Sequence, residues 1–340
     1  MSINKLIRPN IARLVPYSSA RSEYTGSEGT FLDANENPYG IYNRYPDPKQ
    51  KKLKEKLSTI KNVPVENIFI GNGSDEIIDL AIRIFCRPGI DKVLTFTPTY
   101  GMYAVAANIN DVEIVSLPLD RNFQVDFEGL KEVLKDELIN IIFICSPNNP
   151  TGNSLHSLHY IIENFKGLIF LDEAYIDFSM YPSALVYLNK FPNVIISQTM
   201  SKAYGLAAAR IGIAYASRDI ISLYNKVKPP YNVSSLNQDA ALKALNAKRK
   251  YRKQVKKILD ERESVQLQLD KMKTVVKIYP TDANFLLVEF TDADEIYEHL
   301  VRGNVITRNR NSLIKNCIRI TIGSKKENKK LIAALNSIAG

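Results

Sequence analysis

The stretch TMSKAYGLAAARIG, residues 199–212, places two positive charges in a run of small and apolar side chains. Lys202 directly follows a serine, and Arg210 comes eight residues later. A lysine in apolar surroundings loses hydration, which lowers its pKa because the charged ammonium form is disfavoured. Such an amine can act as a nucleophile. The alternative is a surface lysine lying along a helix, so the neighbouring motifs must distinguish the two interpretations.

Three further motifs place polar residues where apolar runs end. IFIGNGSDEII changes from a strand pattern to two glycines, then to Ser74 as a helix N-cap with Asp75 in the first turn. IFICSPNNPTG ends in a turn that contains Asn149, and GLIFLDEAY ends in Asp172 followed by Tyr175. Taken alone, each motif is also compatible with an ordinary turn or a capped helix.

Short apolar runs alternate with helical patterns, which predicts an α/β fold with a mostly parallel sheet. The predicted strands are residues 67–71, 92–96, 113–117, 140–146, 167–173, 193–199, 210–216, 284–290 and 317–323. Helices are predicted at 74–85 and 127–138, and a long charged helical region from about 224 to 273. Because ligands gather at the carboxyl ends of parallel strands, we expect the motifs to meet at one edge of the sheet.

Together these residues match the needs of pyridoxal 5'-phosphate, which are a lysine for a Schiff base, an acid against the ring nitrogen, donors to the ring oxygen and a phosphate cup. We expect Lys202 to bind the aldehyde and Asp172 to keep the ring nitrogen protonated. Tyr175 and Asn149 are expected to hydrogen-bond the phenolic oxygen. The residues expected to hold the phosphate are Ser201, Arg210, Ser74 and Asp75.

Length and composition favour a cytoplasmic globular protein. At 340 residues, the chain is long enough for one large domain and a smaller one. The N-terminal MSINKLIRPN has no apolar core of a signal peptide, and no segment approaches the length of a membrane span. The cysteines Cys86, Cys145 and Cys317 stand far apart, so we expect reduced thiols.

The net charge of +9 raises the alternative of a nucleic-acid partner. The excess lysine is spread over amphipathic segments such as KQKKLKEKL and KRKYRKQVKK, which favours solvated helix faces. A positive field would also concentrate anionic substrates. His156 and His159 have helical spacing but no nearby carboxylate or cysteine cluster, so no metal site is predicted.

Over nearly its whole length the chain resembles the fold-type I aminotransferases that use pyridoxal phosphate, and within them the histidinol-phosphate aminotransferase family. The blocks that carry the resemblance are, in order, LDANENP, YPDP, GNGSDE, PTYGMY, SPNNPTG, DEAY, SKAYGLAAARIG and CIRITIG. The resemblance implies a large three-layer α/β/α domain with a mostly parallel sheet, and a smaller α+β domain. The implied ranges are an N-terminal arm with part of the small domain at 1–44, the cofactor domain at 45–255 and the small domain at 256–340.

The same resemblance implies a homodimer whose active site lies at the interface. Tyr45 of YPDP then reaches the partner's cofactor phosphate, and Tyr100 of PTYGMY stacks on the cofactor ring. Thr199, which opens the lysine block, is counted among the cofactor-binding residues. Without the family, Tyr45 and Tyr100 would be read as turn or packing aromatics.

For the substrate, the resemblance implies that Arg319 of CIRITIG clamps a carboxylate or phosphate, a role suited to its planar fork. Arg308 matches a second phosphate-binding arginine, and Arg310 competes with it for that role. Tyr17 and Asn35 match positions that close over the substrate. The chain departs from the family pattern at Gln198 and in a short loop between residues 308 and 319.

The implied reaction is transamination of L-histidinol phosphate with 2-oxoglutarate in histidine biosynthesis, giving imidazole acetol phosphate and glutamate. Lys202 would also move the substrate α-proton as a general acid and base. An aromatic or broad-specificity aminotransferase would keep every cofactor residue and differ only in the pocket. A phosphothreonine decarboxylase and a regulator that senses the cofactor are further alternatives.

Overall fold

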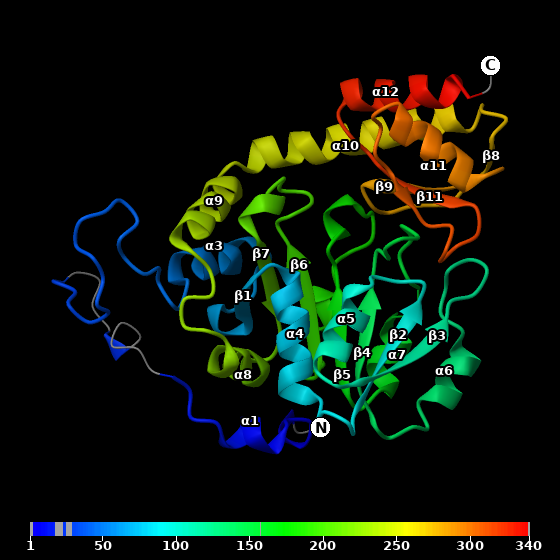
Figure 1. Cartoon of the computed structure of the whole chain (residues 1–340). Coiled ribbons are helices and arrows are strands. Elements are labelled where there is room, and N and C mark those ends of the chain that lie inside the picture. The colour runs from blue at the N-terminus through cyan, green and yellow to red at the C-terminus, as the bar shows by residue number, and fades with distance from the viewer. Residues whose placement is uncertain (1–2, 18–22, 25–28, 157, 339–340) are drawn as a thin grey trace.

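The computed structural model describes residues 3–17, 23–24, 29–156 and 158–338 of the chain. A seven-stranded sheet of order β1-β7-β6-β5-β4-β2-β3 forms its centre (Figure 1). The strands are β1 (Ile68–Asn72), β2 (Lys92–Thr97), β3 (Glu113–Pro118), β4 (Ile139–Cys145), β5 (Leu168–Asp172), β6 (Val194–Thr199) and β7 (Ile211–Tyr215). Strands β3, β2, β4, β5 and β6 pair in parallel, whereas β7 is antiparallel to both β6 and β1. The predicted mostly parallel sheet is therefore confirmed.

Helices cover both faces of this sheet, which explains why its inner strands are apolar on both sides. Every residue of β5, β6 and β7 is buried. One face packs against α4 (Ser74–Phe85), α5 (Met102–Ile109) and α8 (Arg218–Val227). The other packs against α3 (Lys51–Lys61), α6 (Phe127–Val133), α7 (Leu158–Asn164) and α9 (Ser235–Asn246). These layers form the expected α/β/α sandwich. Short 3-10 helices connect them: η2 (Val65–Asn67), η3 (Ile176–Phe178), η4 (Ala184–Tyr187) and η5 (Ala207–Ala209).

A second, antiparallel sheet follows α10 (Lys248–Leu269) and has the order β10-β11-β9-β8. Its strands are β8 (Val275–Ile278), β9 (Phe285–Phe290), β10 (Arg308–Asn309) and β11 (Cys317–Thr321). Figure 1 shows α11 (Ala293–Arg302) and α12 (Lys325–Asn336) grouped with this sheet and the end of α10. The sequence did not indicate β8 and β10, because both are short and only partly buried.

The long helical region expected from about residue 224 to 273 is divided in the structure. Helix α8 ends at Val227, and α9 and α10 are separate helices. Tyr251 and Val255 of α10 pack toward the large sheet, whereas Val265 and Leu269 belong to the core of the small sheet. The proposed domain boundary between residues 255 and 256 thus lies inside one continuous helix.

The N-terminal arm was expected to include part of the small domain, and its first described residues pack on the large domain. Ile3 of η1 (Ile3–Lys5), Leu6, and Ile11 of α1 (Pro9–Arg13) pack into the core between the large sheet, α4 and α8. Their apolar side chains are removed from water there by residues of α4 and α8. Across the described parts of the chain, no helix is both long and apolar enough to cross a membrane.

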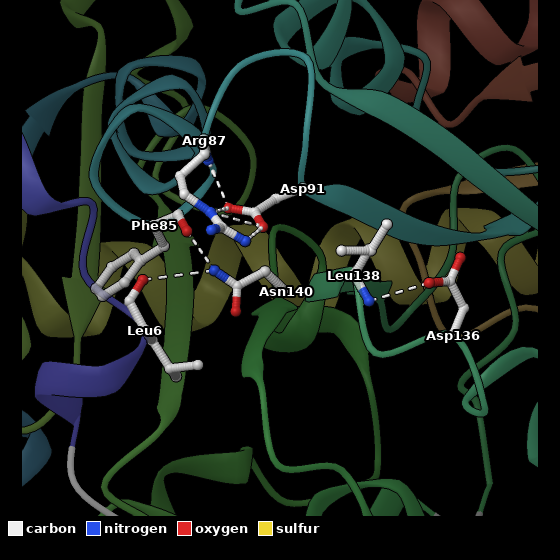
Figure 2. Close-up of polar contacts among 7 residues, drawn as sticks. All are labelled: Leu6, Phe85, Arg87, Asp91, Asp136, Leu138 and Asn140. Carbon is white, nitrogen blue, oxygen red and sulfur yellow. Dashed lines mark hydrogen bonds and ion pairs between the residues drawn. The ribbon is translucent and has the colours of Figure 1, made fainter.

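Side-chain contacts brace the amino ends of the large sheet (Figure 2). Asn140 in β4 donates its side-chain amide to the carbonyl oxygens of Leu6 and Phe85, which links the N-terminal segment to the end of α4. In the loop before β2, Arg87 Nη2 lies 2.6 Å from Asp91 Oδ1. These contacts lie at the edge opposite the carboxyl ends of the strands, so they support the sheet without occupying the edge where the predicted site residues meet.

Candidate active site

A cavity of about 600 Å³ lies at the carboxyl ends of the parallel strands. Its lining includes the last residues of β4, β5 and β6, which are Cys145, Asp172 and Thr199. The small sheet supplies the opposite side. The predicted site residues that line this cavity are Ser74, Asp75, Tyr100, Asn149, Asp172, Tyr175, Thr199, Ser201, Lys202, Arg210, Arg308 and Arg319.

Asp172 is a buried acid whose carboxylate is held on two sides. Its Oδ2 accepts a 2.7 Å hydrogen bond from the hydroxyl of Tyr103, and its Oδ1 accepts a 3.1 Å bond from the backbone N–H of Ala174. Burial raises the pKa of Asp172 to about 6, and these two hydrogen bonds oppose that rise. A carboxylate in this setting suits a cationic partner such as a protonated ring nitrogen.

Lys202 lies in the loop between β6 and η5, with its ammonium nitrogen 5.6 Å from the ring centroid of Tyr175. Burial lowers the pKa of Lys202, and the positive charge of Arg319 lowers it further. Tyr175 packs edge-on against Phe285 of the small sheet, with 5.2 Å between ring centroids. The lysine is therefore placed between the two sheets as an amine that loses its proton more readily than usual.

The start of α4 corrects one detail of the prediction. Its N-cap is Gly73, with φ +81°, and Ser74 is the first helical residue. No side chain caps this helix, so its first N–H groups remain available to an anion. A Cβ on Gly73 would lie 2.5 Å from Nη2 of Arg210, and one on Gly212 would lie 2.4 Å from the backbone carbon of Gly73. Glycine at both positions lets β7 and Arg210 approach the helix start.

Arg210 is ion-paired in this structure, with Nη2 3.1 Å from Oδ2 of Asp75. The hydroxyl of Tyr100 donates to Oδ1 of the same carboxylate at 3.0 Å. The Asp75 carboxylate is therefore engaged by Arg210 and Tyr100. Asp75 can still bind an anion through its backbone N–H, and its carboxylate orients the guanidinium of Arg210. Beside them, the hydroxyl oxygens of Thr199 and Ser201 lie 3.0 Å apart.

Three arginines form the other end of the cavity. Arg308 of β10 stands directly opposite Arg319 of β11, and Arg310 lines the cavity next to them. Arg319 donates from Nη1 to the side-chain oxygen of Asn149. The Nε atoms of Arg310 and Arg319 are buried without a hydrogen-bond partner. Burial lowers the pKa of Arg310, and so do the charges of Arg319 and Arg308. Within the described residues none of the three forms an ion pair, so this end of the cavity suits an anion.

Three predicted residues lie outside this cavity. Tyr45 stacks on Tyr231 with ring centroids 4.3 Å apart, and it lines a different cavity of about 370 Å³ together with Asn35. Tyr17 is 77% exposed. Tertiary packing also brings Tyr103 into contact with the site residue Asp172. The sequence did not indicate this role, although Tyr103 follows Tyr100 by three residues in PTYGMY.

The family model for class I and II aminotransferases matches residues 30–335. The chain belongs to this aminotransferase family. It is 50% identical to the histidinol-phosphate aminotransferase of Parabacteroides distasonis, and the match covers 99% of each chain.

Two solved structures share the aminotransferase fold. The histidinol-phosphate aminotransferase of Sinorhizobium meliloti in complex with pyridoxal-5'-phosphate has a TM-score of 0.79 at 24% identity, covering 90% of each chain. The L-threonine-O-3-phosphate decarboxylase of Porphyromonas gingivalis has a TM-score of 0.74 at 20% identity, covering 88% of this chain and 91% of that one. Because both an aminotransferase and a decarboxylase share it, the fold alone does not separate these two reactions.

The residues of this aminotransferase fit pyridoxal 5'-phosphate. The buried carboxylate of Asp172 faces a ring-sized cavity, and the amine of Lys202 lies within the same cavity. The start of α4 has no side-chain cap, so it offers its N–H groups to a phosphate. Gly73 and Gly212 allow Arg210 and β7 to lie close to this helix start. This donor set combines an acid, an amine and an anion cradle.

Proposed function

We propose that this aminotransferase uses pyridoxal 5'-phosphate to transfer the amino group of L-histidinol phosphate to 2-oxoglutarate, a step of histidine biosynthesis. The products are imidazole acetol phosphate and glutamate. The observation that carries the proposal is a near full-length identity of 50% to a histidinol-phosphate aminotransferase. The cavity supports it, because an amine and an acid lie at one end and three arginines at the other.

The residues that would hold the cofactor follow strands of the large domain. Asp172 would face the ring nitrogen, Asn149 and Tyr175 would hydrogen-bond the ring oxygen, and Tyr100 would cover the ring face. Lys202 would supply the amine for the covalent link. The residues proposed to hold the phosphate are Ser74, Asp75, Thr199, Ser201 and Arg210. When bound, pyridoxal phosphate supplies an electron sink that stabilises negative charge at the substrate α-carbon.

Lys202 has a second role as the proton carrier. When its Nζ is not bonded to the cofactor, it would be free to accept the proton from the substrate α-carbon and to hold it as the ammonium form. Its lowered pKa suits this role, because burial and Arg319 disfavour the ammonium form. The ring of Tyr175 limits where the amine can move on one side.

The arginine end of the cavity selects anionic substrates. L-Histidinol phosphate carries a phosphate ester and 2-oxoglutarate carries two carboxylates, so each presents an anion for a guanidinium fork. Of the three arginines, Arg319 is the main ligand of this anion, because Asn149 already orients its guanidinium. Arg308 adds a second contact from the paired position on β10.

The proposed assembly is a homodimer with a shared active site. The outward-facing N-terminal region supports it, since Leu32, Tyr39 and Ile41 are about nine-tenths exposed. Exposed apolar residues gathered in one segment are typical of an interface. Tyr45, Tyr17 and Asn35 would then complete the site of the partner chain. The proposed location is the cytoplasm, which suits the free buried thiols of Cys86, Cys145 and Cys317.

An absorption experiment on the purified protein tests the proposed function. The visible band of the bound cofactor should be lost on adding L-histidinol phosphate and restored by 2-oxoglutarate. Phenylalanine and O-phospho-L-threonine are the parallel additions. Equal loss of the band with phenylalanine would support an aromatic or broad-specificity aminotransferase instead. Carbon dioxide release from phosphothreonine would support the decarboxylase.

A further inference from the structure

Tyr103 is a fully buried tyrosine directly behind the cofactor acid. Its side chain is 0% exposed, and its hydroxyl donates to Oδ2 of Asp172 at 2.7 Å. It does not line the cavity itself, so it cannot touch a cofactor or a substrate there. The hydroxyl therefore acts on the site through the residues it contacts, chiefly Asp172, with the thiol of Cys145 beside it.

The ring of Tyr103 is held so that its hydroxyl cannot swing away. It stacks on Phe143 of β4 with 4.9 Å between centroids and an interplanar angle of 13°. It also meets the ring of Tyr100 edge-on at 5.6 Å. Burial and the neighbouring Asp172 raise the pKa of Tyr103 well above its usual value, so the hydroxyl keeps its proton and remains a donor.

The turn that begins α5 supplies two parts of the site at once. Tyr100 comes just before the helix and lines the cavity, while Tyr103 lies in its first turn beneath the end of β5. With the Ala174 N–H bonded to Oδ1, Tyr103 fixes the second oxygen and so prevents rotation of the carboxylate. A fixed carboxylate presents the same lone pair to the cavity at all times.

We propose that Tyr103 is a positioning residue that keeps Asp172 ionised and correctly oriented for the ring nitrogen of the cofactor. A hydrogen bond to a carboxylate stabilises the ionised form, which here opposes the effect of burial. The proposal rests on the cofactor assignment of the proposed function and not on the identity of the substrate.

The test is a titration of the apoprotein with pyridoxal 5'-phosphate from pH 5 to pH 8, without substrate, in wild type and Tyr103→Phe. The variant keeps the ring and removes only the donor. We expect its affinity for the cofactor to fall roughly tenfold near pH 6, the change that a charge-assisted hydrogen bond produces. The loss should shrink as the pH rises, because Asp172 regains its charge above its raised pKa.

Two further variants separate positioning from general destabilisation. Tyr224→Phe removes another buried tyrosine donor, whose hydroxyl bonds the carbonyl oxygen of Ile77, and it should leave the affinity unchanged. In an Asp172→Asn background the side chain cannot ionise, so adding Tyr103→Phe should not alter the pH dependence. An affinity of Tyr103→Phe that equals the wild-type value at every pH, or an affinity loss that persists in full in the Asp172→Asn background, would overturn the proposal.

The same titration separates this inference from the proposed function. A wild-type protein that binds pyridoxal phosphate, together with a Tyr103→Phe variant that binds it identically, would contradict the positioning role only. A wild-type protein that does not bind the cofactor would contradict both. Substrate preference has no influence on either result.

Discussion

At the residue scale, Lys202 differs from the other lysines of this chain in its surroundings. Many of the others are exposed on helices, whereas Lys202 is exposed in a loop and into the cavity, beside Tyr175 and near Arg319. Both burial and the nearby positive charge favour the neutral amine, which is the form that attacks an aldehyde.

Lys202→Arg keeps the positive charge and removes the nucleophilic amine. We expect kcat to fall roughly 100- to 10,000-fold, the range for loss of a positioned acid–base group. Borohydride treatment of the wild-type holoprotein should add the cofactor mass covalently, and the variant should gain none by mass spectrometry. The control is Lys253→Arg, at an exposed position on α10. Covalent labelling of the variant to the wild-type extent would assign the link to another lysine.

Burial is the main cause of the lowered pKa of Lys202, and the charge of Arg319 adds to it. Because this charge lowers the pKa of Lys202, Arg319→Gln should raise that pKa and leave more of the amine protonated at neutral pH. The rate of cofactor attachment to the apoprotein, measured against pH, should therefore rise at higher pH in the variant. Arg308→Gln is the matched control, because Arg308 is not a cause of this pKa shift. Superimposable profiles for wild type and Arg319→Gln would contradict the coupling.

Arg310 is expected to contribute to binding of the substrate anion. Its Nε is buried without a partner, and an anion in the cavity would satisfy it. Arg310→Gln should raise the KM for L-histidinol phosphate roughly 10- to 150-fold, since a charged hydrogen bond contributes roughly 1.5–3 kcal/mol. Steady-state kinetics measure this effect, with Arg302→Gln on the exposed side of α11 as the control. An unchanged KM would contradict a role for Arg310 and would indicate that Arg308 and Arg319 alone bind the anion.

At the element scale, the phosphate cradle depends on how closely β7 approaches the start of α4. Gly212 of β7 pairs with Gly71 of β1, and the backbone of Gly73 lies directly against it. No side-chain rotation relieves a clash between two backbones. The positions of β7 and Arg210 relative to the start of α4 therefore depend on glycine at residues 73 and 212.

Gly212→Ala tests this coupling. The new Cβ would lie 2.4 Å from the carbon of Gly73, so β7 or α4 must shift. We expect the free energy of unfolding to fall by about 1–3 kcal/mol, as for an overpacked core, and the cofactor affinity to weaken. Thermal unfolding and a cofactor titration measure the two effects. Gly303→Ala is the control, because no atom lies closer than 3.4 Å to its Cβ position and it does not line the cavity. Equal behaviour of both variants would show that the close approach is unimportant.

At the scale of the whole molecule, the arrangement of the site raises the question of a partner chain. Most predicted site residues line one cavity, but Tyr45 faces another cavity and stacks on Tyr231. A homodimer in which Tyr45 of each chain enters the active site of the other would explain why Tyr45 lies outside the cavity of its own chain. Each site would then contain Lys202 of one chain and Tyr45 of the other.

Complementation between two impaired variants tests this exchange. Lys202→Ala and Tyr45→Ala should each have little activity alone. Purified heterodimers from co-expression should regain activity, because one of their two sites contains both native side chains. The control pair is Lys202→Ala with Asp172→Ala, since both residues belong to the same site and no native site can form. Heterodimers of the first pair that remain as inactive as the control would contradict the exchange of Tyr45.

The amino-acid sequence determined the strands of the large sheet and the residues at their carboxyl ends. Apolar runs that are buried on both faces are local signals, and Asp172 and Thr199 end β5 and β6 where those runs stop. The helix from Ser74 to Phe85 was predicted with its observed bounds, because its apolar residues follow the helical period. The parallel sheet then necessarily brings the ends of its strands to one edge.

Only the tertiary structure decided contacts between residues that are distant in the sequence. The bond from Tyr103 to Asp172 spans 69 positions, and nothing in either local pattern indicates it. The packing of Ile3 and Ile11 likewise depends on α4 and α8, which come much later in the chain. The physical reason is that periodicity and turn residues act over a few positions, whereas burial of a side chain depends on which surfaces the whole chain brings together.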